Sequence, residues 1–541
     1  MDGNLAGTLA RRAVTHGWWE RTVFHTARGG VTHGQVHDGA ARAAGVLRAA
    51  GVLSGRRVLL VLPDGVAFVT AFLGVLRLGA VAVLAGPEQT AGEHRRLAGE
   101  AGADVVVCPP ELLDRFPDAC ALTPGDLADD PGTVPDPVTP KAPAYLQYTA
   151  GTTGAPRAVA HGHGDPEVFA YAFARGALAL TAADTTLSAA KAHTPLGLGA
   201  SVLFPLLCGA SAVLWPDAPT PEGTAVQLGR HRPTLLFAVP ALLPGLVETP
   251  RATFASLRAV VSAGEPLQPT LADRAGAAFG CPLLDAFDTA ETGTAAIANT
   301  LTRRRRGTLG TPLPPFEIDV RTPDGRRIRP GERGLLHLRG PSVAHPGALP
   351  TVGPHVPEAR ESAERLPEAG VPWAGVRSPG APWARGGEPR PREDPEAGES
   401  GRFVQVPWAR QGEDDGWVRT GDVVHVDADG FVHHHGRAGE QVDVRGAVVV
   451  PVEVERVLAG HPLVREVAVA VDGDGDLCAF VVAARAAPGR DAGDELIAFA
   501  AERLPESSVP RSVVFREELP RSSTGKVLRR ALDGTERAKV I

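Results

Sequence analysis

Short runs of β-branched residues alternate with longer stretches rich in alanine and leucine through roughly the first 300 residues of the chain. Clear examples are RRVLLVLP (Arg56 to Pro63), ADVVVCPP (Ala103 to Pro110) and RAVVSAGEP (Arg258 to Pro266). Each run ends in turn residues, and strands that alternate with helices are typical of a parallel sheet covered by helices. Two such series predict an α/β fold with two α/β subdomains, because 541 residues exceed what one hydrophobic core holds.

The pattern changes further along the chain. Residues 317–325 (EIDVRTPDG) and 331–341 (GERGLLHLRGP) predict short antiparallel strands around tight turns, and hence a small β-barrel-like subdomain. Residues 345–412 are dominated by proline, glycine, arginine and glutamate without apolar periodicity, which predicts a disordered insertion. The last hundred or so residues have strands and helices of their own. We therefore predict an N-terminal domain over 1–436 and a smaller α+β C-terminal domain over 437–541.

Composition excludes several classes of protein. The net charge of −7 argues against a general nucleic-acid binder, and the dense basic run Arg303 to Arg306 is predicted to be a solvated loop. The five scattered cysteines form no CxxC pair, which suits reduced thiols in the cytoplasm. The N-terminus lacks a signal-peptide core, and the apolar stretch from Gly65 contains Arg77. We expect a buried helix and strand there, in a cytoplasmic protein without a membrane partner.

A turn rich in glycine and threonine, YTAGTTGAPRAV, covers Tyr148 to Val159. Its glycines can present backbone N–H groups and its threonines can add hydroxyl donors, so it predicts a cradle for an anionic phosphate chain. Those residues are Thr149, Gly151, Thr152, Thr153 and Gly154. A Walker loop is excluded because Pro156 stands where that motif needs glycine, and the basic residue of the turn is Arg157.

Six further segments follow this turn in a set order: VVSAGEPL from Val260, AFDTAETG from Ala286, GWVRTGD from Gly416, HGRAGEQVDVRGAVVVPVEVE from His435, LPESSVP from Leu504 and PRSSTGK from Pro520. Together they resemble the core motifs of the adenylate-forming superfamily, which includes acyl-CoA and aryl-CoA ligases, peptide-synthetase adenylation domains and luciferases. The stretch from Ser188 to Leu243 is most similar to benzoate-CoA ligase and related aryl-acid ligases. The resemblance implies a mobile C-terminal domain and a two-step reaction. An aromatic acid first reacts with ATP to give an acyl adenylate and pyrophosphate, and coenzyme A then takes the acyl group.

The resemblance also implies roles for single residues. Lys526 would bridge the substrate carboxylate and the α-phosphate, Glu291 would hold Mg²⁺, Asp422 would bind the ribose hydroxyls, and Arg437 would contact the ribose and phosphate. The adenine would lie against the turn Gly264, Glu265 and Pro266, with Phe287 stacked on it and Asp288 and Thr289 beside the nucleotide. The remaining implied residues are the acid pocket Lys191, His193, Thr194, Gly197 and Asp288, and the hinge Gly439.

Some positions depart from the family pattern. Ala290 replaces a threonine, Asp443 stands at a lysine-like position of the thioester loop, and Asp288 replaces a glycine at the acid pocket. A carboxylate buried without a partner is costly, so we expect Asp288 to have one of two roles. It recognises an amino or hydroxyl group on the ring of the aromatic acid, or it points to solvent or pairs with a nearby arginine. These departures leave two alternatives open. The acyl group could pass to a carrier protein, an amine or another nucleophile, or the protein could be a degenerate nucleotide-binding protein. A homodimer is possible, although no interface signal is visible.

Three consecutive histidines, His433, His434 and His435, form another distinctive feature. On a strand they would point alternately to opposite faces, so they cannot all hold one metal ion. We expect them to be inert.

Overall fold

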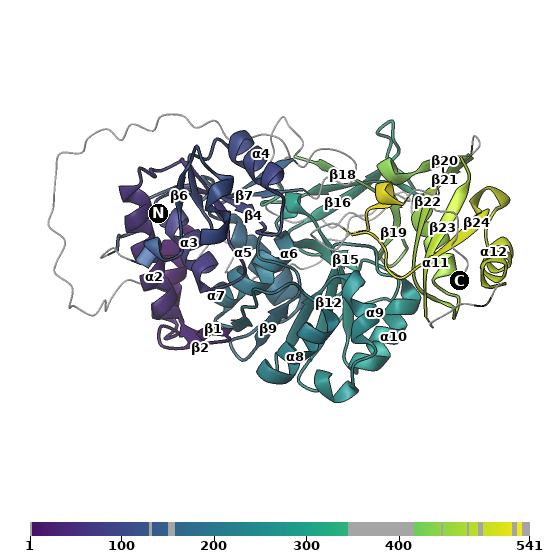
Figure 1. Cartoon of the computed structure of the whole chain (residues 1–541), viewed down its shortest axis with the longest axis horizontal. Coiled ribbons are helices and arrows are strands. Elements are labelled where there is room, and N and C mark those ends of the chain that lie inside the picture. The colour runs from purple at the N-terminus through teal and green to yellow at the C-terminus, as the bar shows by residue number, and fades with distance from the viewer. Residues whose placement is uncertain are drawn as a thin grey trace, which may run out of the picture. The chain divides into compact units, whose positions relative to one another are not determined.

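The computed structural model describes residues 3–128, 132–149, 157–329, 331–344, 416–444, 447–472, 475–484, 489, 491–521 and 527–532. The fold is α/β, with a large N-terminal domain and a small C-terminal domain (Figure 1), as the sequence predicts. The predicted insertion, residues 345–412, lies outside the described residues. The exact boundary between the two domains, after residue 436, stays a prediction.

The first α/β subdomain contains a six-stranded sheet in the order β6-β5-β3-β4-β7-β8, parallel except for the antiparallel pair β7 and β8. Its strands are β3 (Arg57–Val61), β4 (Val81–Ala85), β5 (Val105–Val107), β6 (Cys120–Leu122), β7 (Pro143–Tyr148) and β8 (Ala158–Gly162). Its sequence region also contains the helices α2 (His33–Ala49), α3 (Val66–Arg77) and α4 (Ala91–Ala101). The apolar stretch from Gly65 forms α3 and then β4, as expected. Among the described residues, no helix combines the length and apolar character needed to cross a membrane.

The second subdomain contains a nine-stranded sheet in the order β15-β14-β13-β12-β11-β9-β10-β1-β2, parallel from β13 to β1. Its strands are β1 (Thr22–Thr26), β2 (Gly29–Thr32), β9 (Thr185–Ser188), β10 (Ser211–Val213), β11 (Leu235–Ala238), β12 (Ala259–Ala263), β13 (Leu283–Asp288), β14 (Ala295–Ala298) and β15 (Thr311–Pro312). Its sequence region contains the helices α5 (Asp165–Phe169), α6 (Pro195–Leu198), α7 (Phe204–Cys208), α8 (Pro221–His231), α9 (Leu243–Leu246) and α10 (Pro269–Phe279), while α1 (Leu5–Thr15) packs on α2, α3 and α7. Because β12 and β13 are parallel neighbours, the segments that follow them meet at one edge of the sheet, where α/β proteins commonly bind ligands.

The third part of the N-terminal domain is an antiparallel sheet of β16 (Glu317–Arg321), β17 (Gly334–Arg339), β18 (Val418–Val426) and β19 (Val432–Arg437). The C-terminal domain has β20 (Val442–Val444), β21 (Ala447–Val449), β22 (Val464–Val471), β23 (Leu477–Ala483) and β24 (Ser512–Arg516), with α11 (Pro451–Leu458) and α12 (Ala492–Ala501). A short 3₁₀ turn, η8 (Ala438–Glu440), follows β19 and carries the predicted hinge Gly439.

The basic run from Arg303 to Arg306 is exposed, as predicted, but it is also paired. The guanidinium of Arg305 contacts the carboxylates of Asp427 at 2.5 Å and Asp429 at 2.6 Å, and it lies 4.3 Å from the centre of the Phe431 ring. The run therefore holds the turn between β18 and β19 in addition to facing solvent.

Gly310 joins the nine-stranded sheet to the antiparallel sheet. Its carbonyl accepts a hydrogen bond from the Val432 N–H at 2.8 Å, and its φ is +90°. A Cβ at this position would lie 1.9 Å from the carbonyl carbon of Ala298 on β14. The chain therefore passes between the two sheets only because residue 310 lacks a side chain.

We expect Gly310→Ala to lower the free energy of unfolding by about 3 kcal/mol or more, because left-handed strain of roughly 1–2 kcal/mol adds to a backbone clash. Gly325→Ala is the matched control, since Gly325 has a φ of +89° but open space around its missing Cβ. Urea unfolding of both variants checks this. Equal losses in the two variants would contradict the clash.

Candidate active site

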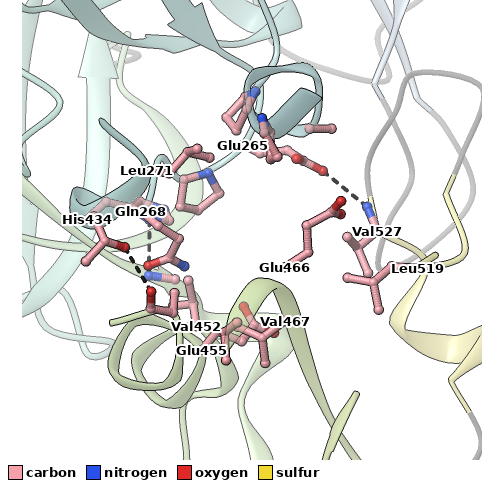
Figure 2. Close-up of a pocket in the computed structure, with 18 of the residues that line it drawn as sticks. Glu265, Gln268, Leu271, His434, Val452, Glu455, Glu466, Val467, Leu519 and Val527 are labelled. Carbon is pink, nitrogen blue, oxygen red and sulfur yellow. Dashed lines mark hydrogen bonds between the residues drawn. The ribbon is translucent and has the colours of Figure 1, made fainter. Parts of the chain in front are cut away.

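A cavity of about 630 Å³ lies at the ends of β12 and β13 (Figure 2). Its wall also includes residues of β18, β19, α11 and β22, so both domains line it. Seven residues predicted from the sequence line this cavity: Gly264, Glu265, Pro266, Phe287, Asp288, Asp422 and Arg437. They come from four segments that are far apart in the chain.

Glu265 connects the turn after β12 to the segment that follows the predicted catalytic lysine. Its carboxylate oxygen Oε1 accepts a hydrogen bond of 3.1 Å from the backbone N–H of Val527, 262 residues later, as the dashed line in Figure 2 shows. Lys526 itself lies outside the described residues, but its neighbour in the chain is held at the cavity. Phe287, which is 8% exposed, adds an apolar ring to the same wall.

Asp422 is a buried carboxylate, 2% exposed, at the point where β18 pairs with the end of β19. Its oxygen Oδ1 lies 3.0 Å from Nε2 of His434 and 3.4 Å from Nε of Arg437. Burial alone raises the pKa of the carboxyl, but the His434 hydrogen bond and the Arg437 charge outweigh burial, so the pKa is lowered. Asp422 therefore stays ionised at neutral pH.

The second oxygen of Asp422, Oδ2, is buried and has no hydrogen-bond donor among the described residues. An ionised carboxylate oxygen is purely an acceptor, so it suits the hydroxyl donors of a ribose. The donors on Oδ1 include His434, which lines the cavity and which the sequence led us to expect to be inert. Strand alternation alone did not predict this contact, because it does not tell which face of the strand meets the cavity.

Glu291 lies in the 3₁₀ turn η7 (Ala290–Thr292), directly after β13. Thr289 caps this turn by accepting a hydrogen bond from the Thr292 N–H at 3.3 Å. The carbonyl of Ala290 is 2.7 Å from Nε2 of the fully buried His161 on β8. Since β8 directly follows the predicted phosphate turn, this contact connects that turn to the glutamate segment.

Thr149 and Arg157, at the two ends of the predicted phosphate turn, are joined by two hydrogen bonds of 3.0 Å. The Thr149 N–H donates to the Arg157 carbonyl, and the Arg157 N–H donates to Thr149 Oγ1. The residues between them, Gly151, Thr152, Thr153 and Gly154 included, lie outside the described residues.

A role of Glu291 in holding a magnesium ion stays a prediction, and Glu291 is not among the residues that line the cavity. Its charge helps to raise the pKa of Arg437, after the larger contributions of Asp422 and Glu440. In the part of the chain that the structure describes, no group of three or more His, Cys, Asp or Glu side chains could hold a metal. A site with one carboxylate suits Mg²⁺, which keeps several waters and takes its other ligands from nucleotide phosphates.

The predicted acid-pocket residues Lys191, His193, Thr194 and Gly197 are not among those that line this cavity. Lys191 and His193 precede α6, Thr194 is its N-cap, and Gly197 lies within the helix. Thr194 caps that helix by accepting a hydrogen bond from the Gly197 N–H at 3.3 Å, and a Cβ on Gly197 would lie 2.0 Å from the Lys191 carbonyl oxygen. Gly197 is therefore required by packing, and a role of this loop in binding the acid stays a prediction.

Arg529 ties the Lys526 segment to the predicted hinge. Its guanidinium contacts Glu455 of α11 at 2.9 Å and Glu440 of η8 at 3.2 Å. Burial lowers the pKa of Arg529, but the charges of Glu455 and Glu440 outweigh it and raise the pKa. Glu440 directly follows Gly439, so the predicted hinge lies next to the cluster that holds Arg529.

A cavity at the ends of parallel strands, completed by a C-terminal domain that carries a lysine motif, defines an adenylate-forming enzyme of the α/β class. The chain matches the AMP-binding enzyme family over residues 9–346 and the AMP-binding enzyme C-terminal domain over residues 453–526. The protein belongs to the AMP-binding enzyme family.

Its relatives include ligases of aromatic acids. The p-hydroxybenzoic acid–AMP ligase of Mycobacterium tuberculosis is 36% identical, over 98% of this chain and 69% of the relative. The 4-hydroxybenzoate–CoA/benzoate–CoA ligase of Rhodopseudomonas palustris is 31% identical, over 98% of this chain and 93% of the relative. The crystal structure of a benzoate CoA ligase from Burkholderia xenovorans matches with a TM-score of 0.79 at 28% identity, over 98% of this chain and 99% of that one.

Asp64 is a buried acid that contacts the predicted acid-pocket loop. The side chain is 5% exposed and accepts a hydrogen bond from the Ala192 N–H at 2.9 Å, and burial raises its pKa to about 6. The folded protein therefore binds a proton more tightly than the unfolded chain, whose aspartates titrate near pH 4. The stability that this proton contributes is present at low pH and is lost as the pH rises through about 6.

Asp64→Asn should remove this dependence, because asparagine keeps the acceptor for Ala192 without the charge. Between pH 5 and 7, the wild-type free energy of unfolding should fall by about 1 kcal/mol more than that of the variant. Urea unfolding at both pH values measures the difference. Parallel pH profiles for the two proteins would contradict a raised pKa.

Proposed function

We propose that the protein activates an aromatic carboxylic acid with ATP to form an acyl adenylate and then transfers the acyl group to coenzyme A. The observation that carries the proposal is the cavity in which Asp422, Arg437 and the turn at Glu265 meet the segment next to Lys526. The named activities of the relatives, benzoate and hydroxybenzoate ligases, support an aromatic acid as the substrate. The five cysteines are free thiols, which supports a cytoplasmic site of action, where ATP and coenzyme A are available.

The chemical difficulty of the first step is electrostatic, because a carboxylate attacks a polyanion. Fixed positive charge near the α-phosphate offsets the charge that develops there. In the proposed mechanism, Lys526 supplies a compact charge between the carboxylate and the phosphate, while Arg437 supplies a second charge from the end of β19. Mg²⁺, held by Glu291, would neutralise phosphate charge. Asp422 orients the nucleotide through the ribose, and Phe287 offers a face to the adenine.

Asp288 is the proposed determinant of the ring substituent. It ends β13 next to Phe287 and lines the same cavity. A carboxylate there can accept a hydrogen bond from a phenolic hydroxyl or an aromatic amine. Relatives named p-hydroxybenzoic acid–AMP ligase and anthranilate–CoA ligase act on acids that carry such groups.

One finding supports an acyl acceptor other than coenzyme A. The relative with 36% identity is named an AMP ligase, whereas the relative with 31% identity is named a CoA ligase. Asp443 stands at a lysine-like position in the loop that would guide coenzyme A. The alternative is therefore adenylation of the same acid followed by transfer to a carrier protein or another nucleophile.

Acid-dependent exchange of pyrophosphate into ATP, measured across aromatic and aliphatic acids, tests the first step. Lys526→Ala should lower exchange at least about 100-fold, because a preorganised charge at the reacting phosphate is lost. Lys141→Ala, at an exposed lysine, is the control. Exchange that survives in Lys526→Ala would refute its role, and absence of exchange with every acid would refute the proposed function. Mass spectrometry with coenzyme A then tells a thioester from a released or otherwise transferred adenylate.

Asp288→Gly should reduce the preference for p-hydroxybenzoate or 2-aminobenzoate over benzoate by roughly tenfold or more, since a hydrogen bond to a charged group is lost. The measurement is kcat/KM in the exchange assay for each acid with the parent and the variant. An unchanged ratio would remove Asp288 from substrate recognition.

A further inference from the structure

His434 has a defined tautomer in this structure. The backbone N–H of Gly436 donates a hydrogen bond of 3.3 Å to Nδ1 of its imidazole, so Nδ1 carries the lone pair. The proton of the neutral ring is then on Nε2, which lies 3.0 Å from Oδ1 of Asp422 and donates to it. The side chain is 10% exposed and lines the cavity, where Figure 2 labels it.

The neighbouring histidines take no part in this arrangement. Side chains alternate along β19, and His433 and His435 both stack on His425, with ring centres 4.3 Å and 5.0 Å apart. His433 pairs with Asp427 at 2.9 Å and His435 pairs with Glu453 at 3.1 Å. His434 is thus the member of the triplet that faces Asp422, and His433 provides a control on the opposite face of the same strand.

The donors around Asp422 are unevenly distributed. His434 and Arg437 both approach Oδ1, and a side-chain hydrogen bond from Thr420 also helps to lower the pKa of Asp422, whereas Oδ2 is buried without a donor among the described residues. A guanidinium tends to bind both oxygens of a carboxylate at once. A second donor on Oδ1 opposes that arrangement, because it fixes the rotation of the carboxylate and keeps Oδ2 available to a ligand.

We propose that His434 is a positioning residue for ribose recognition: its Nε2–H holds Asp422 so that Oδ2 accepts hydrogen bonds from the ribose hydroxyls of the nucleotide. This inference rests on the proposed function, in which Asp422 binds the ribose. It adds His434 as a residue whose contribution to nucleotide affinity depends on the ribose hydroxyls.

The test compares ATP with 2′,3′-dideoxy-ATP, which lacks both ribose hydroxyls. Calorimetric binding to the full chain gives the Kd of each nucleotide for the parent, His434→Phe and His434→Gln. His434→Phe keeps a planar ring but removes the donor, so the Kd for ATP should rise roughly tenfold or more, as for loss of a hydrogen bond to a charged group. The Kd for dideoxy-ATP should change less than about twofold.

Two further variants separate positioning from a structural effect. Glutamine can place an amide N–H near the position of Nε2, so His434→Gln should bind ATP within about threefold of the parent. His433→Phe, on the other face of β19, should leave both Kd values unchanged.

Three results would overturn the inference: an equal rise of both Kd values in His434→Phe, an unchanged Kd for ATP in that variant, or a parent protein that binds the two nucleotides equally. Pyrophosphate exchange is measured alongside. A parent that prefers ATP over dideoxy-ATP but exchanges no pyrophosphate would refute the proposed function, while the His434 comparison would still decide the inference.

Discussion

A buried carboxylate that must stay charged organises the site. Asp422 is almost inaccessible, and an unpaired charge in that position would cost several kcal/mol. The pairing of β18 with β19 resolves this by bringing His434 and Arg437 to one oxygen of the carboxylate. Because Arg437 is also the last residue of β19, the interaction that satisfies the charge determines where the antiparallel sheet ends and where the chain continues into the C-terminal domain.

The rest of the cavity follows from this placement. The antiparallel sheet is attached to the nine-stranded sheet where Gly310 passes between β14 and β19, so the edge formed by β12 and β13 and the carboxylate of Asp422 line one cavity. The C-terminal domain contributes through Val527, held by Glu265, and through Arg529, held by Glu455 and Glu440. In the proposed reaction, rotation at Gly439 would move these two contacts together with the catalytic lysine next to them in the chain, and would so separate the two half-reactions.

The residues assigned to each half of the proposed active site are divided between the cavity and other segments. For the nucleotide, the turn at Glu265, Phe287, Asp422 and Arg437 line the cavity, whereas Thr149, Arg157, Thr289 and Glu291 do not. For the acid, Asp288 lines the cavity and the loop around Lys191 does not. That loop is held by a helix cap at Thr194, a close approach at Gly197 and a long-range hydrogen bond from the Ala192 N–H to the buried Asp64.

The sequence by itself determined the α/β class, because periodicity and turn chemistry are local properties. The ordered motifs, through their resemblance to a known family, indicated the family. The sequence also determined that His433, His434 and His435 alternate in direction. Only the tertiary structure decided which of them faces Asp422, that Arg305 pairs with Asp427 and Asp429, and that Glu265 meets Val527 across 262 residues. These contacts depend on how sheets and domains pack against one another, and no local pattern in the chain encodes a partner so far away in the sequence.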